Sequence, residues 1–115
     1  MTTSTLINKL TNALDEMKAF DIKVMDVRGL TSIAETMIFA SGQSDRQVKA
    51  LANKLIETAK EQGTIPIGVE GQQQGEWVLV DLGDIIAHIM HPTIRAYYQL
   101  ESLWSPQHEK ADASV

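Results

Sequence analysis

The sequence predicts a small mixed β-sheet with helices packed on it, a fold of the α/β or α+β class. Two features lead to this prediction. Residues 77–90 contain two runs rich in Val, Ile and Leu on either side of Gly83-Asp84, which indicates two strands joined by a tight turn. Residues 45–62 repeat apolar side chains at helical spacing. The predicted order is helix, strand, strand, helix, strand, strand and helix.

The two strands around Gly83-Asp84 form the element on which the other predictions depend. Gly at the first position of a two-residue loop fits a type II′ turn, because Gly accepts a positive φ. Alternation of side chains then gives one aliphatic face: Val78, Val80, Leu82, Ile85, Ala87 and Ile89. The other face is mixed: Trp77, Leu79, Asp81, Ile86, His88 and Met90. We expect the aliphatic face in the core and a binding surface on the mixed face, unless a C-terminal helix covers all or part of it.

Three elements are predicted before residue 45. Residues 5–19 predict a helix whose apolar stripe consists of Ile7, Leu10, Leu14 and Met17. Thr3 or Ser4 can cap its start. Short apolar runs predict strands at 22–27 and 36–40. These elements have a structural role in the simplest interpretation.

Residues 45–62 predict the clearest helix. Ser44 followed by Gln47 is a capping-box pattern, and Gly63 is well placed to end the helix. Its apolar face consists of Val48, Leu51, Ala52, Leu55, Ile56 and Ala59.

The remaining segments are predicted from turn residues. Ile65-Pro66-Ile67 is expected to be extended or at a sheet edge, because Pro cannot donate to a ladder. Residues 68–75 predict a loop. Pro92 suits the first turn of a last helix over 93–104. We expect one domain over residues 1–105 and a disordered tail over 106–115.

The composition excludes several classes of protein. The 115 residues suffice for one domain with a real core, and the absence of Cys excludes disulfides, thiol nucleophiles and Cys-based zinc sites. No signal peptide or membrane-spanning run is recognisable, so we expect a cytoplasmic protein. The net charge of −5 suits a basic protein partner better than a phosphate backbone.

Residues that could carry catalysis or bind a metal have simpler interpretations. His88 and His91 stand three apart near Asp81 and Asp84, but side chains three apart on a strand point to opposite faces, so we expect no metal site. No base partner is recognisable for Ser41 or Ser44. The turn they flank could hold an anion at the helix N-terminus, although Ser44 as a cap explains the pattern.

Trp77 and the nearby acids favour a binding surface. An exposed Trp beside acidic loop residues is typical of a binding hot spot, whereas the competing interpretation is a core Trp. Asp81 and Asp84 could pair for acid–base chemistry, but at a turn they are more simply solvated.

Several segments together resemble the Iojap-like family of ribosomal silencing factors. The resemblance runs in order from about residue 5 to 105 and rests on DIKVMDVRG at 21–29, TMIFASGQSDRQVKA at 36–50, GVEG at 68–71, WVLVDLGDIIAHIM at 77–90 and YYQLESLW at 97–104. Each segment alone would be weak, whereas the combination is specific.

The resemblance implies a non-catalytic protein without a cofactor. Members of this family bind the large ribosomal subunit through ribosomal protein L-fourteen, block joining of the subunits and lower translation in stationary phase or starvation. Organellar relatives take part in large-subunit assembly, and some members form homodimers. No sequence-specific contact with nucleic acid and no membrane association are expected.

The family's motifs match this chain at Glu70, in the hairpin and at Tyr98, Glu101, Leu103 and Trp104. The residues that we predict to bind the partner are Glu70, Trp77, Asp81, Leu82, Asp84, His88, Met90 and Tyr98.

The resemblance also implies a topology similar to that of nucleotidyltransferases. Those enzymes follow a Gly-Ser turn with a D-x-D pair that holds Mg²⁺. Here Ser41-Gly42-Gln43-Ser44 looks like the turn, but Asp45-Arg46-Gln47 follows it and no D-x-D is present. We therefore expect the protein to have no enzymatic activity. Large-subunit assembly is the main alternative to silencing, and a diverged nucleotidyltransferase is a less favoured one.

Overall fold

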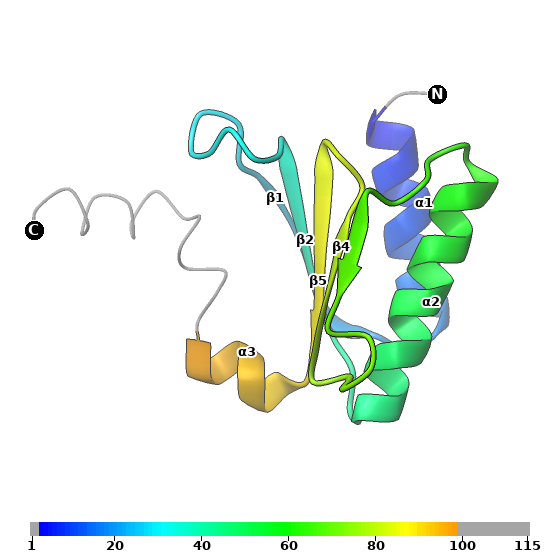
Figure 1. Ribbon diagram of the computed structural model, residues 1–115, viewed down its shortest axis with the longest axis vertical. Helices are drawn as coiled ribbons and strands as arrows, with labels where there is room; N and C mark the ends of the chain where they lie inside the picture. Colours follow the sequence, from blue (N-terminus) through cyan, green and yellow to red (C-terminus); the bar gives the residue numbers. More distant parts are fainter. Residues whose placement is uncertain (1–2, 99–115) are drawn as a thin grey trace, which may run out of the picture.

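The computed structural model describes residues 3–98, with side chains up to residue 95. Within this range the chain forms three helices and five strands (Figure 1). They are α1 (Thr3–Glu16), β1 (Phe20–Asp26), β2 (Thr36–Ser41), α2 (Asp45–Glu61), β3 (Gly68–Glu70), β4 (Trp77–Asp81), β5 (Ile85–Met90) and α3 (Pro92–Tyr98). The predicted fold class, a mixed sheet with helices packed on it, is confirmed.

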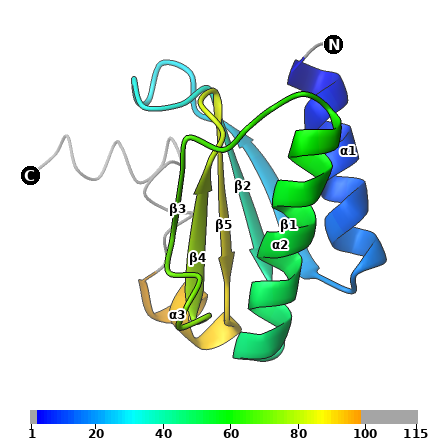
Figure 2. The ribbon, with the colours of Figure 1, turned by 45° about the vertical axis from the view of Figure 1, so that its right-hand side comes forward.

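The strands form one sheet in the order β1-β2-β5-β4-β3 (Figure 2). The central pair, β2 and β5, is parallel, and the other neighbouring pairs are antiparallel. A parallel pair requires a long connection between its strands, and α2 lies within that connection. In this order β2, β5 and β4 each have a neighbouring strand on both sides, whereas β1 and β3 form the edges of the sheet.

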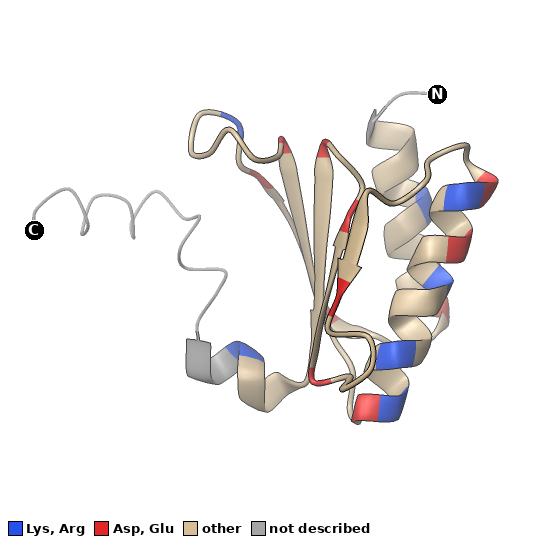
Figure 3. Cartoon of the chain, viewed as in Figure 1, with Lys and Arg blue, Asp and Glu red and all other residues tan. Residues whose placement is uncertain are grey.

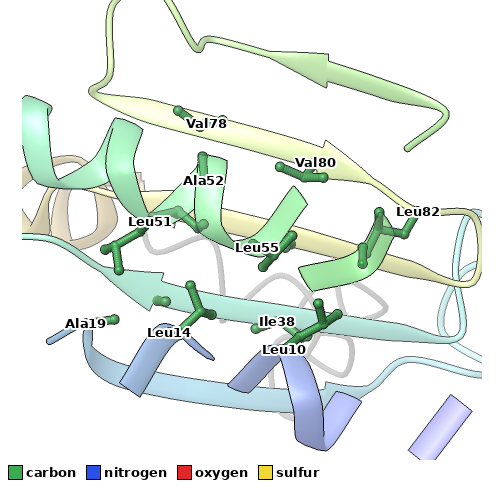
Figure 4. Packing of buried hydrophobic residues seen from close by; sticks show 14 of the residues in the cluster. Leu10, Leu14, Ala19, Ile38, Leu51, Ala52, Leu55, Val78, Val80 and Leu82 are labelled. Atoms are coloured by element: carbon green, nitrogen blue, oxygen red, sulfur yellow. The ribbon is translucent and has the colours of Figure 1, made fainter. Parts of the chain in front are cut away.

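α1 and α2 cover one face of the sheet (Figures 1 and 2). Leucines of both helices meet the aliphatic side chains of the strands there, among them Leu10, Leu14, Leu51 and Leu55 (Figure 4). These four leucines are fully buried, and burial of each contributes about 1.5–3 kcal/mol. The aliphatic face predicted for the hairpin lies wholly in this core: Val78, Val80, Leu82, Ile85, Ala87 and Ile89.

The hairpin between β4 and β5 has the predicted register. Val80 pairs with Ala87, and the Leu82 N–H donates to the Ile85 carbonyl at 2.8 Å. Gly83 has a φ of +96°, whereas Asp84 does not have a positive φ. A positive φ at the first turn residue alone is the signature of a type II′ turn.

The ends of α2 agree with prediction in most respects. The Ser44 Oγ accepts a hydrogen bond from the Gln47 N–H at 3.1 Å. The Gln47 side chain accepts from the Gln43 N–H instead of closing a capping box on Ser44. Beyond the last turn, the Gly63 N–H bonds to the Lys60 carbonyl, so the helix ends where predicted.

The boundaries predicted for the first helix are wrong at both ends. α1 already includes Thr3, so Ser4 lies inside the helix and does not cap it. α1 ends at Glu16 because Lys18 takes a φ of +70° and the Ala19 N–H bonds to the Leu14 carbonyl. This is a Schellman ending that uses Lys in place of the usual Gly.

The strand β3 falls where a loop was predicted, and the prediction is corrected here. Gly68 pairs with Asp81, Val69 with Val80 and Glu70 with Leu79. Three residues bounded by glycines are too short for alternation to reveal a strand, and the pairing depends on the neighbouring β4.

The last helix starts at Pro92, close to its predicted start, and the His91 carbonyl accepts from the Ile94 N–H. The predicted extension to residue 104, the domain end at 105 and the tail over 106–115 lie outside the described residues.

Gly71 offers a test of how β3 is held beside β4. A Cβ added there would lie 2.0 Å from the Trp77 carbonyl oxygen, and Gly71 has a φ of +83°. We therefore expect Gly71→Ala to lower the free energy of unfolding by about 2 kcal/mol or more, measured by urea denaturation. Gly68→Ala is the matched control, because nothing lies within 4 Å of its added Cβ; it should change stability by about 0.5 kcal/mol at most. Equal denaturation midpoints for the two variants would contradict this account.

Candidate partner-binding surface

The face of the sheet opposite α1 and α2 carries the mixed side chains of the hairpin. Trp77, Leu79 and Asp81 alternate along β4 and are half-buried. Glu70 on β3 stands directly opposite Leu79, so it projects from the same face, and it is exposed. Together with Asp84 at the hairpin turn, these residues are called the β3–β4 surface below: Glu70, Trp77, Leu79, Asp81 and Asp84.

The chain itself covers the β2–β5 half of this face. A second apolar cluster there combines Phe39, Ile86 and Met90 with Val27 and Ala34 from the segment around the β1–β2 connection. Ile94 of α3 packs against the cluster, and Figure 1 shows α3 and the β1–β2 connection on the side away from α1 and α2. The described part of α3 therefore covers this face only partly, which was one of the outcomes that the sequence left open.

Three rings lie side by side across the boundary between the covered and the open half. Phe39 on β2 pairs with His88 on β5, and their rings are stacked, with centroids 5.0 Å apart and planes 9° apart. The Trp77 ring lies 6.0 Å from the His88 ring, and the Trp77 indole N–H donates to His88 Nδ1 at 3.1 Å. The register of β2, β5 and β4 thus produces a row of Phe, His and Trp.

His88 is held as a neutral imidazole. Burial disfavours its charged form and lowers its pKa to about 4. Since Nδ1 accepts the indole N–H, the neutral ring carries its proton on Nε2. At neutral pH the open half of the face therefore gains no positive charge from His88.

The charges of the β3–β4 surface are all acidic. Residues 62–94, which follow α2, contain no Lys or Arg, and their acids are Glu70, Glu76, Asp81 and Asp84. Figure 3 shows red segments on the sheet and its turns, while much of the blue lies on α2. Asp81 Oδ1 accepts the Gly83 N–H at 2.9 Å, so this acid also stabilises the hairpin turn. Such a surface is complementary to Lys and Arg of a partner.

The predicted partner-binding residues fall into three groups by exposure. Glu70 and Asp84 are exposed, and Trp77 and Asp81 are half-buried. Leu82, His88 and Met90 are buried, at 8%, 8% and 0% exposure. The side chain of the remaining residue, Tyr98, lies outside what the structure describes. A direct partner contact by any of these residues stays a prediction.

Two exposed isoleucines near this surface were not predicted as binding residues. Ile65 and Ile67 are 76% and 73% exposed, and the Ile67 N–H donates to the Asp81 carbonyl at 2.7 Å. Their signal in the sequence was an apolar side chain on each side of Pro66 at a predicted sheet edge.

The residues considered for metal binding or catalysis have structural partners. His88 Nδ1 accepts the Trp77 indole N–H, and His91 Nδ1 accepts the Thr93 N–H at 3.3 Å. Ser41 is fully buried and accepts a hydrogen bond from Arg95 at 2.9 Å. Among residues 3–98 no group of three or more His, Asp or Glu could hold a metal ion.

Comparisons with known proteins decide the family. A family model described as "Ribosomal silencing factor during starvation" matches residues 1–115. The chain belongs to this family. A ribosomal silencing factor of Chromobacterium violaceum is 49% identical over 102 residues, which cover 88% of this chain and 84% of the relative.

The chain is also similar to a solved structure and to a mitochondrial protein. A crystal structure of a Chromobacterium violaceum protein has a TM-score of 0.88 and 45% identity, covering 90% of this chain and 87% of that one. A Mus musculus protein named "Mitochondrial assembly of ribosomal large subunit protein 1" is 29% identical over 86% of this chain and 45% of its own length. The predicted resemblance is confirmed, and the bacterial relatives are named for silencing of ribosomes and not for a catalysed reaction.

No helix within the described part of this silencing-factor chain is long and apolar enough to cross a membrane.

His88 predicts a pH dependence of stability. Its pKa is about 4 in the folded chain and about 6.5 when unfolded, so the unfolded chain binds more protons between these values and stability falls as the pH falls. We expect this group to remove about 3 kcal/mol of unfolding free energy between pH 7 and pH 4. Urea denaturation of wild type and His88→Asn at both pH values measures it. A pH dependence unchanged by the substitution would contradict the assignment.

Proposed function

We propose that this protein silences ribosomes by binding the large subunit through ribosomal protein L-fourteen and blocking the joining of the small subunit. Binding by the β3–β4 surface represses translation in stationary phase or starvation. The observation that carries the proposal is family membership, since the family model is described by silencing during starvation and matches the whole chain.

The chemistry of the β3–β4 surface supports a basic protein as partner. Trp77 presents a half-buried indole on the same face of the sheet as the acids Glu70 and Asp81, with Asp84 at the turn. Aromatic side chains with a fixed position are favoured hot spots, and a rim of acids attracts Lys and Arg of the partner during encounter. The same acids disfavour direct contact with phosphate groups.

A role in large-subunit assembly is the second candidate function. The Mus musculus relative is named for assembly of the ribosomal large subunit in mitochondria. Both functions use the large subunit as partner, so they differ in the step that is affected. The third alternative, a diverged nucleotidyltransferase, receives no support from the turn at Ser41, because no D-x-D follows and Ser41 is buried against Arg95.

Sedimentation of separated subunits tests silencing directly. With the protein added, we expect it to comigrate with free large subunits on a sucrose gradient and the fraction of joined ribosomes to fall. Unchanged joining at saturating protein would contradict silencing. Comigration without any effect on joining would favour the assembly role.

Trp77→Ala tests the contribution of the indole. We expect affinity for isolated ribosomal protein L-fourteen, measured by calorimetry, to weaken by about 2 kcal/mol or more. Phe20→Ala is the matched control, because Phe20 is a half-buried aromatic residue at the opposite edge of the sheet. If Trp77→Ala lowers the melting temperature sharply and leaves the affinity unchanged, Trp77 has only a structural role.

The acids of the hairpin turn test electrostatic attraction. Asp81→Asn combined with Asp84→Asn should slow association and flatten its salt dependence, because rim charges act mainly on the on-rate. The fold should persist, since Asn retains the Oδ1 that accepts the Gly83 N–H. Stopped-flow association at several salt concentrations measures both effects. Glu57→Gln with Glu61→Gln removes the same charge from the exposed surface of α2 and should leave the salt slope unchanged. A wild-type slope in the Asp81/Asp84 variant would place these acids outside the interface.

A further inference from the structure

We propose that His88 is a positioning residue: it fixes the orientation of the Trp77 indole on the β3–β4 surface and acts on partner binding through that indole, without touching the partner. The inference rests on the proposed function, since it assigns a role to His88 in the same binding event.

The first step concerns what His88 can reach. His88 is 8% exposed, whereas Trp77 is only half-buried, so a partner on this face meets the indole before the imidazole. Phe39 is stacked under the His88 ring at 5.0 Å and has no exposed surface. The imidazole is therefore enclosed by its own chain on the covered side and faces Trp77 on the other.

The second step concerns what holds the indole. Met90 is the direct cross-strand neighbour of Trp77 and supplies an apolar contact without a hydrogen-bond acceptor suited to fix a rotamer. His88 is the diagonal neighbour, and its Nδ1 accepts the indole N–H at 3.1 Å. This bond has a direction, so it selects one orientation of the indole ring, which a non-directional apolar contact does not do.

The third step concerns the rigidity of the acceptor. The strand β5 lies between β2 and β4, and the stack with Phe39 keeps the imidazole plane within 9° of the phenyl plane. An acceptor on a central strand moves less than one on an edge or loop. A side chain that is already ordered loses less rotamer freedom on binding, and this preorganisation strengthens the complex.

A pair of substitutions separates the hydrogen bond from packing. His88→Phe keeps a ring of similar size on Phe39 but removes the acceptor. His88→Asn gives up the stack but places an oxygen acceptor near the position of Nδ1. We expect His88→Phe to shift the Trp77 indole N–H resonance upfield and to speed its exchange with water, and His88→Asn to keep both closer to wild type. The chain has two Trp, and the spectrum of Trp77→Phe assigns the resonance.

Affinity for ribosomal protein L-fourteen should change in parallel with the resonance and the water exchange of the Trp77 indole N–H. His88→Phe should weaken binding by about threefold to tenfold, as expected when one side chain must be ordered on binding. In a Trp77→Phe background, His88→Phe should have no further effect, because its influence passes through the indole. Leu55→Ala controls for lost stability, because Leu55 is fully buried between α2 and the opposite face of the sheet. This variant should leave the indole resonance and the affinity unchanged.

Defined outcomes would overturn the inference. A wild-type indole resonance in His88→Phe would show that the imidazole does not fix Trp77. An equal loss of affinity from His88→Phe with and without Trp77 would show that His88 contacts the partner directly. If wild type itself does not bind ribosomal protein L-fourteen, the proposed function fails together with the docking role, and the indole resonance still decides whether His88 orients Trp77. Should His88→Phe not fold, the smaller His88→Leu replaces it in every measurement.

Discussion

The pairing of Leu82 with Ile85 across the Gly83-Asp84 turn sets the register on which the rest of the molecule depends. A shift of one residue would turn one of the two strands over, so that either Trp77 and Asp81 of β4 or His88 of β5 would point into the leucines of α1 and α2. The Asp84 carbonyl extends this constraint, because it accepts the N–H groups of Glu35 and Thr36 and so aligns the start of β2 with β5. One turn therefore determines both the core and the position of the ring row.

The predictability of each element from sequence followed the length of its pattern. The hairpin and α2 carry long periodic patterns and local signals, such as the cap at Ser44, and their register and core faces were predicted correctly. The strand β3 was missed because three residues carry no period of their own. The end of α1 was misplaced because Lys18 adopts the conformation that usually marks a Gly.

The sequence predicted which side chains share a face of the candidate surface, but not how deeply each of them is buried. Alternation placed Trp77, Asp81 and His88 together, whereas the burial of His88 depends on Phe39, which comes from a strand almost fifty residues away. The sequence distance hides such a contact until the parallel pairing of β2 with β5 is known. Leu82 illustrates the same limit: it was predicted to bind the partner, although its own face packs into the core under the helices.

The separation of charge within the fold affects how the protein is oriented as it diffuses toward a partner. Residues 62–94 carry four acids and no Lys or Arg, whereas α2, on the other side of the sheet, carries four cations against three acids. Such a separation gives the described part of the chain an electric dipole across its two layers. The field of a cationic surface exerts a torque on this dipole, which turns the sheet toward the cations and the helices away. The molecule is thereby oriented while it is still diffusing, and fewer encounters begin with the wrong face.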